Sequence, residues 1–281
     1  LTVALSADAQ RAAWYVGRER REGTIEQRDA IAARGWDRFV EGVCEALPNP
    51  HDPLLAVGAL ARFDGLTIAD RLAELDLDDE ERDVLRAELE SLAHGPLDEA
   101  GAVSVLRWHA LSGYSLSLTQ YTGGRVTLAD GTGALLRSIA AAAPFETRLA
   151  TPVAAIPRGV DGVEVETRAG DVHRGRKVVV AMPLNVLGSL DFEPALPEPK
   201  REAIALGQSS RGIKLFIRSC GPAVLQNAIR PRHPFGYLDT EELYADGTQL
   251  QIGFGVDAEQ CDVADTPALQ AALDDLLPGY E

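Results

Sequence analysis

Residues 149–216 constrain the fold more than any other part of the chain, because their elements follow one another in a specific order. They predict two strands with alternating apolar residues, a continuous apolar strand, a helix and a returning strand, at residues 153–157, 163–167, 177–182, 197–206 and 213–218. The continuous strand is apolar on both faces, which is typical of a strand covered on both sides. The segment therefore predicts a β-meander and a buried strand, followed by a helix and a strand that carries Lys214.

The residues before this segment are predicted to be mostly helical. Capping residues and apolar spacing indicate helices at about 6–21, 24–47, 68–75, 78–94 and 99–112, and then a short strand, a turn and a helix at 125–128, 130–133 and 134–143. Two further strands and a closing helix are expected at 235–239, 249–256 and 266–277. Helices first and strands later give the fold class α+β.

Composition excludes several classes of function. The chain has 281 residues and a net charge of -16, which argues against a nucleic-acid partner because phosphate backbones require clustered Lys and Arg. No segment approaches the roughly 18 apolar residues of a membrane span. Cys44, Cys220 and Cys261 form no disulfide or zinc pattern, so no metal site is predicted. Unpaired cysteines are typical of a reducing compartment, and the predicted location is cytoplasmic.

Short motifs alone indicate no catalytic group. Asp130-Gly-Thr-Gly133 lacks the length and the lysine of a phosphate-binding loop and is interpreted as a turn. No nucleophile elbow is present. This absence is compatible with an enzyme whose cofactor carries the chemistry. Only three of the 27 Lys and Arg residues are lysines. The choice of Lys214 favours a role for a compact ammonium, although three lysines can also be scattered by chance.

Residues 126–216 resemble the flavin-containing amine oxidase family, which includes monoamine, polyamine and L-amino-acid oxidases. Each matching piece is short, but their order and spacing together are specific. In chain order they are Leu128-Ala-Asp-Gly-Thr-Gly-Ala-Leu135, Leu149-Ala-Thr-Pro-Val-Ala-Ala-Ile156, Val163-Glu-Val-Glu-Thr167, Val178-Val-Val-Ala-Met-Pro-Leu184, Phe192-Glu-Pro-Ala-Leu-Pro197 and Gly212-Ile-Lys214. A fainter similarity covers most of the chain from about residue 60 onward.

The resemblance implies a discontinuous architecture of two domains. Residues 1–126 and 203–281 would form the helical and sheet parts of a substrate domain, a mixed β-sheet surrounded by helices. Residues 127–202 would be a β-meander excursion that belongs to the FAD-binding domain. The chain would therefore leave the substrate domain once and return to it.

The same resemblance implies an FAD cofactor and a set of site residues. Val153 would pair its backbone with the adenine, and Ala181 and Pro183 would lie beside the cofactor. Lys214 would approach flavin N5 through a water and is the predicted catalytic residue. The predicted lining of the substrate pocket is Tyr237, Phe254, Leu116 and Ser117.

The implied reaction is the two-electron oxidation of a small-molecule amine to an imine, with O2 reoxidising the flavin to give H2O2. The family's G-x-G-x-x-G segment and its C-terminal FAD segment are absent from the chain, which begins at Leu1 and has Met182 as its only methionine. We therefore expect a central portion of the enzyme, whose FAD site is completed by missing segments or by a partner chain.

Two alternatives stay open. The chain can be an FAD-less homologue or subunit that binds a partner chain carrying the Rossmann half. It can also belong to a related flavoprotein desaturase or protoporphyrinogen-oxidase-like enzyme. The sequence also leaves open whether the protein is a homodimer and which amine it would oxidise.

Overall fold

The computed structural model describes residues 3–5, 9–124, 126–159, 161–258 and 261–281, and they form an α+β protein with mixed sheets, as predicted. The chain divides into two compact units. The large unit comprises Leu1–Gly131 and Ser209–Glu281, and the small unit comprises Thr132–Gln208. The sequence-based division at 127 and 203 assigns these parts to a substrate domain and an FAD-binding domain, and that assignment stays a prediction.

The large unit combines a helical layer with a sheet. Its described elements are β1 (Val3–Leu5), β2 (Arg11–Val16), β3 (Glu19–Gly23), α1 (Ile25–Phe39), α2 (Val43–Ala46), η1 (Pro53–Ala56), α3 (Val57–Asp64), α4 (Ile68–Ala73), α5 (Asp79–Ala93), α6 (Ala102–Leu111), α7 (Leu116–Gly124), β4 (Val126–Leu128), β9 (Ile213–Cys220), β10 (Gln226–Ile229), β11 (Tyr237–Leu243), β12 (Thr248–Gly255) and α11 (Thr266–Leu276). Strands β1 and β4 pair with each other as a separate antiparallel ribbon.

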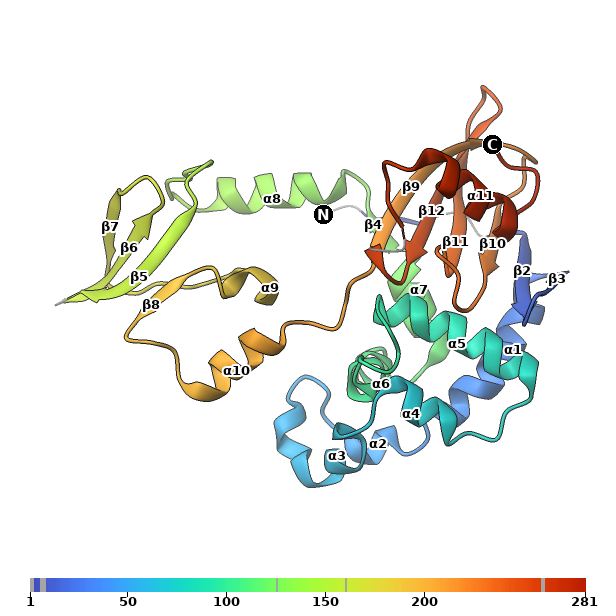
Figure 1. The fold of residues 1–281 in the computed structure, drawn as a ribbon, viewed down its shortest axis with the longest axis horizontal. Coiled ribbons are helices and arrows are strands. Elements are labelled where there is room, and N and C mark those ends of the chain that lie inside the picture. Colours follow the sequence, from blue (N-terminus) through green and yellow to red (C-terminus); the bar gives the residue numbers. More distant parts are fainter. Residues whose placement is uncertain (1–2, 6–8, 125, 160, 259–260) are drawn as a thin grey trace. The chain divides into compact units, whose positions relative to one another are not determined.

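The main sheet of the large unit has the strand order β3-β2-β10-β11-β12-β9. All neighbouring strands are antiparallel except β2 and β10, which are parallel. These two strands come from opposite ends of the chain and lie side by side in Figure 1. One face packs on α1 and α5 through Trp14, Ile31, Val84 and Ile229. The other face packs on α11 through Tyr15, Phe235, Leu238, Leu273 and Leu276. Alternate side chains of each strand therefore point to different helices.

The predicted helix at residues 6–21 is wrong from residue 11 onward, since β2 and β3 form a hairpin there, and residues 6–8 lie outside the described residues. The run Ala12-Ala-Trp-Tyr-Val16 alternates between the two faces of the sheet, with Trp14 toward α1 and α5 and Tyr15 toward α11. Val16 pairs with Glu19, and Gly17 in the intervening turn has φ +60. A β-branched and aromatic run before a tight turn favours a hairpin over a helix.

Three helices begin where the sequence predicts, two of them at the predicted caps Thr24 and Thr67 and the third after Asp78. Thr24, Thr67 and Asp78 each accept a hydrogen bond from the backbone N–H three residues on, and each forms a complete capping box. The helix predicted at residues 24–47 is divided, because Gly42 takes a left-handed conformation (φ +80) between α1 and α2. The sequence thus located the helix starts better than their ends.

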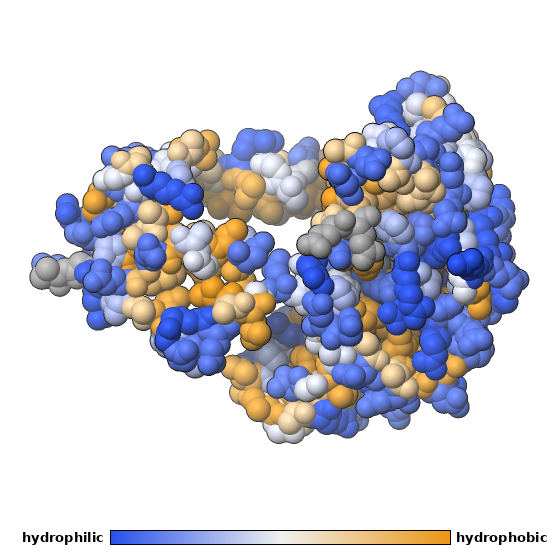
Figure 2. Space-filling view, in the orientation of Figure 1, coloured by the Kyte–Doolittle hydropathy of each residue, from blue (hydrophilic) through white to orange (hydrophobic). Residues whose placement is uncertain are grey.

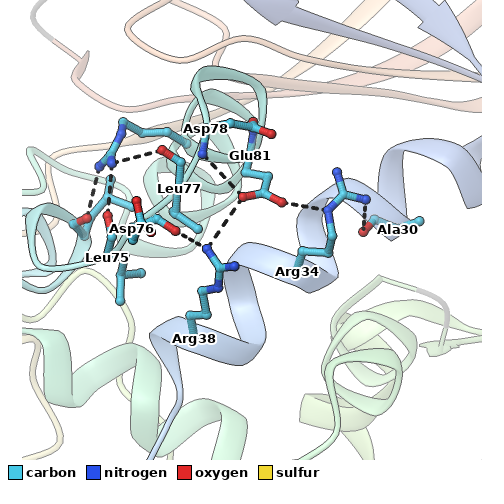
Figure 3. Close-up of polar contacts among 10 residues, drawn as sticks. Ala30, Arg34, Arg38, Leu75, Asp76, Leu77, Asp78 and Glu81 are labelled. Atoms are coloured by element: carbon cyan, nitrogen blue, oxygen red, sulfur yellow. Dashed lines mark hydrogen bonds and ion pairs between the residues drawn. The ribbon is translucent and has the colours of Figure 1, made fainter.

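Buried Glu81 ties α5 to α1 (Figure 3). Its carboxylate lies 2.7 Å from Arg34 Nε and 3.8 Å from an Arg38 guanidinium nitrogen. The same carboxylate accepts the Asp78 N–H at 3.4 Å. A buried carboxylate is stable only when it is paired and hydrogen-bonded, and Glu81 has both kinds of partner. This contact fixes the N-terminal end of α5 against α1.

His109 on α6 is buried, with 4% of its surface exposed. Trp36 Nε1 donates to His109 Nδ1 at 3.2 Å, which requires a ring that is not protonated on that nitrogen. Burial lowers the pKa of His109 from its ordinary value of 6.5, although the Asp37 carboxylate opposes the shift. Trp108 on the same helix is 44% exposed, so α6 buries only part of its surface.

The pKa of His109 gives a pH-dependent contribution to stability. The unfolded chain takes up a proton near pH 6.5 and the folded chain only at lower pH, so the contribution is complete above pH 6.5 and is lost as the pH falls. We expect the difference in unfolding free energy between the wild type and His109→Gln to shrink below pH 6.5, by at most about 1.4 kcal/mol per pH unit. Thermal unfolding at pH 5.5–7.5 measures it, with exposed His51→Gln as the control. A pH-independent difference would contradict this account.

The small unit is built around a sheet of order β7-β6-β5-β8. Its described elements are α8 (Gly131–Ala142, which begins one residue before the unit), β5 (Val153–Gly159), β6 (Gly162–Thr167), β7 (Val172–Gly175), α9 (Leu184–Leu187), β8 (Asp191–Glu193) and α10 (Glu198–Leu206). Strands β5 and β8 are parallel, and the other pairs are antiparallel. The predicted strands at 153–157 and 163–167 and the helix at 197–206 are confirmed.

The predicted buried strand at residues 177–182 is wrong. These residues have no regular secondary structure, and Val179 is 89% exposed. A strand needs a neighbour for its backbone groups, and the described sheet ends at β7 and β8. Figure 2 shows further hydrophobic side chains on the surface of the small unit over α8 and α9. The small unit therefore exposes apolar residues of a kind that proteins usually cover.

Candidate functional site

Three of the predicted site residues lie in one row across the main sheet. Lys214 of β9 is directly opposite Phe254 of β12, and Phe254 is directly opposite Tyr237 of β11. The Lys214 ammonium nitrogen lies 5.0 Å from the centroid of the Phe254 ring, and the Tyr237 and Phe254 rings are 5.6 Å apart in an edge-to-face arrangement. Cross-strand neighbours on one face contact one another, so the register alone brings these residues together.

The two ends of this row differ in exposure. Tyr237 adjoins the core under α1 and α5. Burial, reinforced by the Asp239 carboxylate, raises the pKa of Tyr237 well above its ordinary value of 10.0, so its phenol is neutral. Lys214 is exposed at the other end, where its nitrogen also lies 5.4 Å from the ring of Phe216, which is 65% exposed. The row thus leads from two half-buried aromatic rings to an accessible cation held over aromatic faces.

Position 212, two residues before Lys214, has no room for a side chain and therefore requires glycine. A Cβ on Gly212 would lie 2.7 Å from His94 Cβ and 2.8 Å from the Gly255 carbonyl oxygen. Both distances are too short for any side chain at this position. The backbone N–H groups of Arg211 and Gly212 both donate to the His94 carbonyl oxygen at 2.7 Å. The start of β9 is therefore held against the end of α5.

His94 was not predicted as a site residue, because the five histidines of the chain show no ligand spacing. Its ring lies 5.2 Å from the Phe254 ring, so it joins the row from the helical layer. Burial, and then the charge of Lys214, lowers the pKa of His94 from 6.5. The only local signal was its place before Gly95-Pro96, which marks a helix end.

The close approach at Gly212 gives a sharp stability prediction. Gly212→Ala is expected to lower the unfolding free energy by about 1–3 kcal/mol, since either His94 or the end of β12 must move. Gly65→Ala is the matched control, because Gly65 has φ -88 and a Cβ added there would meet no atom within 4 Å. Chemical denaturation measures both variants. Equal stability of the two would show that the contact is not rigid.

A buried ionic group supports the Tyr237 end of the row. Arg28 of α1 is 6% exposed, and its guanidinium lies 2.6 Å from Asp29 and 3.3 Å from Glu88. It also donates to the Asn227 side chain on β10. Burial raises the pKa of Glu88 in spite of the nearby arginine, whereas the two carboxylates keep Arg28 charged. Helix α1, helix α5 and the sheet meet at this arginine.

The remaining predicted pocket residues lie in the helical layer. Leu116 at the start of α7 packs on the helical core, and Ser117 is exposed with its hydroxyl 3.3 Å from that of Ser115. Neither belongs to the sheet. Their role in a substrate pocket stays a prediction.

The predicted cofactor residues all belong to the small unit. Val153 begins β5 and faces Thr167 on β6, and the Arg168 N–H donates to the Pro152 carbonyl at 2.9 Å. In this antiparallel pattern the N–H and C=O of Val153 point away from β6. The ladder to β8 begins only at Ala155. Ala181 and Pro183 are exposed immediately before α9.

The described part of the chain shows neither a cluster of metal ligands nor a membrane-spanning helix. Within it, no group of three or more His, Cys, Asp or Glu side chains could hold a metal ion. No helix formed by the described residues is both long and apolar enough to cross a membrane. Cys44, Cys220 and Cys261 are free thiols.

Comparison with known proteins decides the family. A family model described as flavin containing amine oxidoreductase matches residues 5–266. The chain belongs to this family. This chain is 30% identical over 238 residues to a pseudooxynicotine dehydrogenase of Pseudomonas sp. The match covers 83% of this chain and 48% of that protein. The chain is 26% identical over 254 residues to a nicotine dehydrogenase of Pseudomonas putida (strain DSM 28022 / S16), covering 88% and 51%.

This chain also matches a solved structure of putrescine oxidase bound to putrescine. The TM-score is 0.73 at 16% identity, over 98% of this chain and 65% of that one, which is a likeness of fold. The chain spans about half the length of the two curated relatives. This coverage shows the family of the chain, and the activity of the whole protein is a proposal.

The small unit fits a flavin nucleotide, the cofactor of this family. The N–H and C=O of Val153 point away from β6 and match an adenine edge, which carries both a donor and an acceptor. The exposed apolar residues Val178, Val179 and Val180 suit a cofactor-facing surface rather than one facing water. These features are compatible with a flavin nucleotide, and the role of the named residues in holding it stays a prediction.

Proposed function

We propose that the whole protein catalyses the FAD-dependent oxidation of a small-molecule amine to an imine, with O2 as the electron acceptor and H2O2 as the product. The observation that carries this proposal is the row of Lys214, Phe254 and Tyr237 on one face of the main sheet. FAD would accept two electrons from the amine and pass them to oxygen. The chain's own residues would bind the amine, exclude water and place a positive charge.

Each residue of the row would have a distinct role. Lys214 would hold a water and a positive charge beside the flavin, where charge develops on oxygen as it is reduced. Phe254 and Tyr237 would pack against the substrate, with the neutral phenol of Tyr237 at the end next to α1 and α5. Val153 would hold the adenine through its backbone, and Ala181 and Pro183 would border the isoalloxazine ring.

The relatives support a substrate class. Two of them are named for nicotine and pseudooxynicotine, and the matched structure binds putrescine. Aromatic rings on three strands favour an amine with a ring over a linear diamine. We therefore propose an aryl-substituted amine. A cytoplasmic location is part of the proposal, in keeping with three free thiols.

An absorbance experiment on the whole protein tests the proposal. Purified protein is expected to show an oxidised flavin band and to release FAD on denaturation. Anaerobic mixing with nicotine, pseudooxynicotine or putrescine is expected to bleach that band, and the two aryl amines should act faster. A protein without flavin would overturn the proposal and favour the FAD-less subunit. A bound flavin that none of these amines reduces would overturn the proposed amine oxidation.

The electron acceptor has a second candidate. The two curated relatives are named dehydrogenases, so an electron-transfer protein could replace O2 in the oxidative half of the cycle. Mixing the amine-reduced protein with air-saturated buffer separates the two cases. Rapid reoxidation with one H2O2 per flavin supports the oxidase, and reoxidation slower than turnover with an artificial acceptor supports the dehydrogenase.

A further inference from the structure

His94 occupies a backbone conformation that its side chain makes unfavourable. It is the C-cap of α5 with φ 49 and ψ 41, in the left-handed region. Helices commonly place glycine in this conformation, and a residue with a Cβ costs on the order of 1 kcal/mol there. Glycine follows directly at position 95. Strain retained at one residue leads to the hypothesis that its side chain is needed.

The position of His94 is coupled to that of Lys214. Its carbonyl oxygen accepts two N–H groups, from Arg211 and Gly212, at 2.7 Å each. Gly212 packs on the Cα and Cβ of His94 with no room for a side chain. Lys214 follows two residues later on β9. The imidazole and the ammonium are thus held by one rigid junction.

The imidazole of His94 faces the same aromatic ring as the ammonium. Its ring centroid lies 5.2 Å from that of Phe254, and the Lys214 nitrogen lies 5.0 Å from it. The His94 side chain is half-buried, so part of it is accessible. Because burial and the charge of Lys214 lower the pKa of His94, the ring is neutral at pH 7. A neutral imidazole has one nitrogen that accepts a hydrogen bond.

We propose that His94 positions the substrate by accepting a hydrogen bond from the N–H of the amine, while the Phe254 ring packs on its carbon skeleton. This inference rests on the proposed amine oxidation and deepens it. Amines are cationic at neutral pH, and the Lys214 ammonium repels them. A neutral acceptor and the faces of Phe254 and Tyr237 offset that repulsion. His94 therefore selects for an amine whose N–H reaches the imidazole while its carbon skeleton packs on the Phe254 ring.

The test uses the flavin-loaded whole protein and two variants that tolerate the left-handed conformation. His94→Gly removes the imidazole, and His94→Asn keeps an acceptor oxygen. Anaerobic stopped-flow reduction by pseudooxynicotine and by nicotine gives the Kd of each amine. His94→Gly is expected to raise the Kd about 10- to 100-fold, the effect of one hydrogen bond to a charged group. His94→Asn should recover part of that loss, and exposed His51→Asn should have no effect.

The oxidative half-reaction provides the discriminating readout. Reoxidation of the reduced flavin by O2 is expected to stay within about twofold of wild type in His94→Gly, because Lys214 is retained. If the amines reduce the wild-type flavin but the Kd is unchanged in His94→Gly, the proposed role of His94 is overturned. The proposed amine oxidation is not affected by that result. A rise in Kd with an equal loss of reoxidation would assign His94 a purely structural role and also overturn it. A wild-type flavin that no amine reduces would overturn the proposed function itself.

Discussion

Replacing Arg28 with methionine is expected to lower the free energy of unfolding by about 3–5 kcal/mol, the cost of leaving a buried charge without its partner. In a unit of this size such a loss corresponds to a fall in Tm of roughly 10 °C. Arg28 lies within 3.3 Å of Glu88 and 2.6 Å of Asp29 and donates to Asn227. Its removal leaves the mostly buried Glu88 without a counterion beneath the Tyr237 end of the row.

The double variant Arg28→Met with Glu88→Leu separates the charge from the packing. Most of the lost stability should return, because an apolar pair of similar volume can replace a buried ion pair. The pH dependence provides a second check. A glutamate whose folded pKa is raised favours the folded state below its ordinary value of 4.5, and this benefit is lost as the pH rises. Arg28 opposes this rise in the pKa of Glu88, so its removal raises that pKa further and the deficit of Arg28→Met should grow as the pH rises above 4.5. A pH-independent deficit would assign it to packing instead.

Replacing Lys214 with methionine is expected to slow flavin reoxidation by O2 on the order of 10²-fold, the typical effect of removing one preorganised electrostatic group. Lys214 is exposed and on the edge strand β9, so its loss should change Tm little. Reduction by the amine should remain or become faster, since a repulsive charge is removed from the pocket. Stopped-flow measurement of both half-reactions gives the two rates separately.

Lys200→Met is the matched control for this prediction, since Lys200 is an exposed lysine on α10 of the small unit. Its reoxidation rate should equal that of the wild type. If Lys214→Met also reoxidises at the wild-type rate and retains its flavin, Lys214 has no role in the oxygen reaction. A loss of flavin in Lys214→Met would instead indicate a role in cofactor binding.

Local sequence signals predicted the parts of the fold that depend on near neighbours. The capping boxes at Thr24, Thr67 and Asp78 involve residues three apart, and each helix begins where expected. The alternation in β9 and β12 placed Lys214 and Phe254 on strands, and their register then made them neighbours. Strand alternation was therefore sufficient to place two of the three row residues on strands, whereas their predicted site roles came from the family resemblance.

The errors arose where the outcome depends on distant residues. The apolar run at 177–182 forms a strand only beside another strand, and none lies there in the described part of the small unit. The hairpin of β2 and β3 was mistaken for a helix, although its aromatic run and tight turn are local hairpin signals, and the pairing of β2 with β10 stabilises it from a distance. His94 was missed because its contacts are with Phe254 and with Gly212, more than a hundred residues away. No local pattern carries such information.

The parallel pairing of β2 with β10 also bears on how the chain reaches this structure. Residues 11–16 lie between β3 and residues 226–229, so the earliest-synthesised strand of the main sheet waits for one of the last. Contacts of such long sequence separation slow folding and leave strand edges open in the meantime. During synthesis the helical layer and the small unit can form first. The row that holds Lys214 is completed only after Phe254 of β12 has left the ribosome.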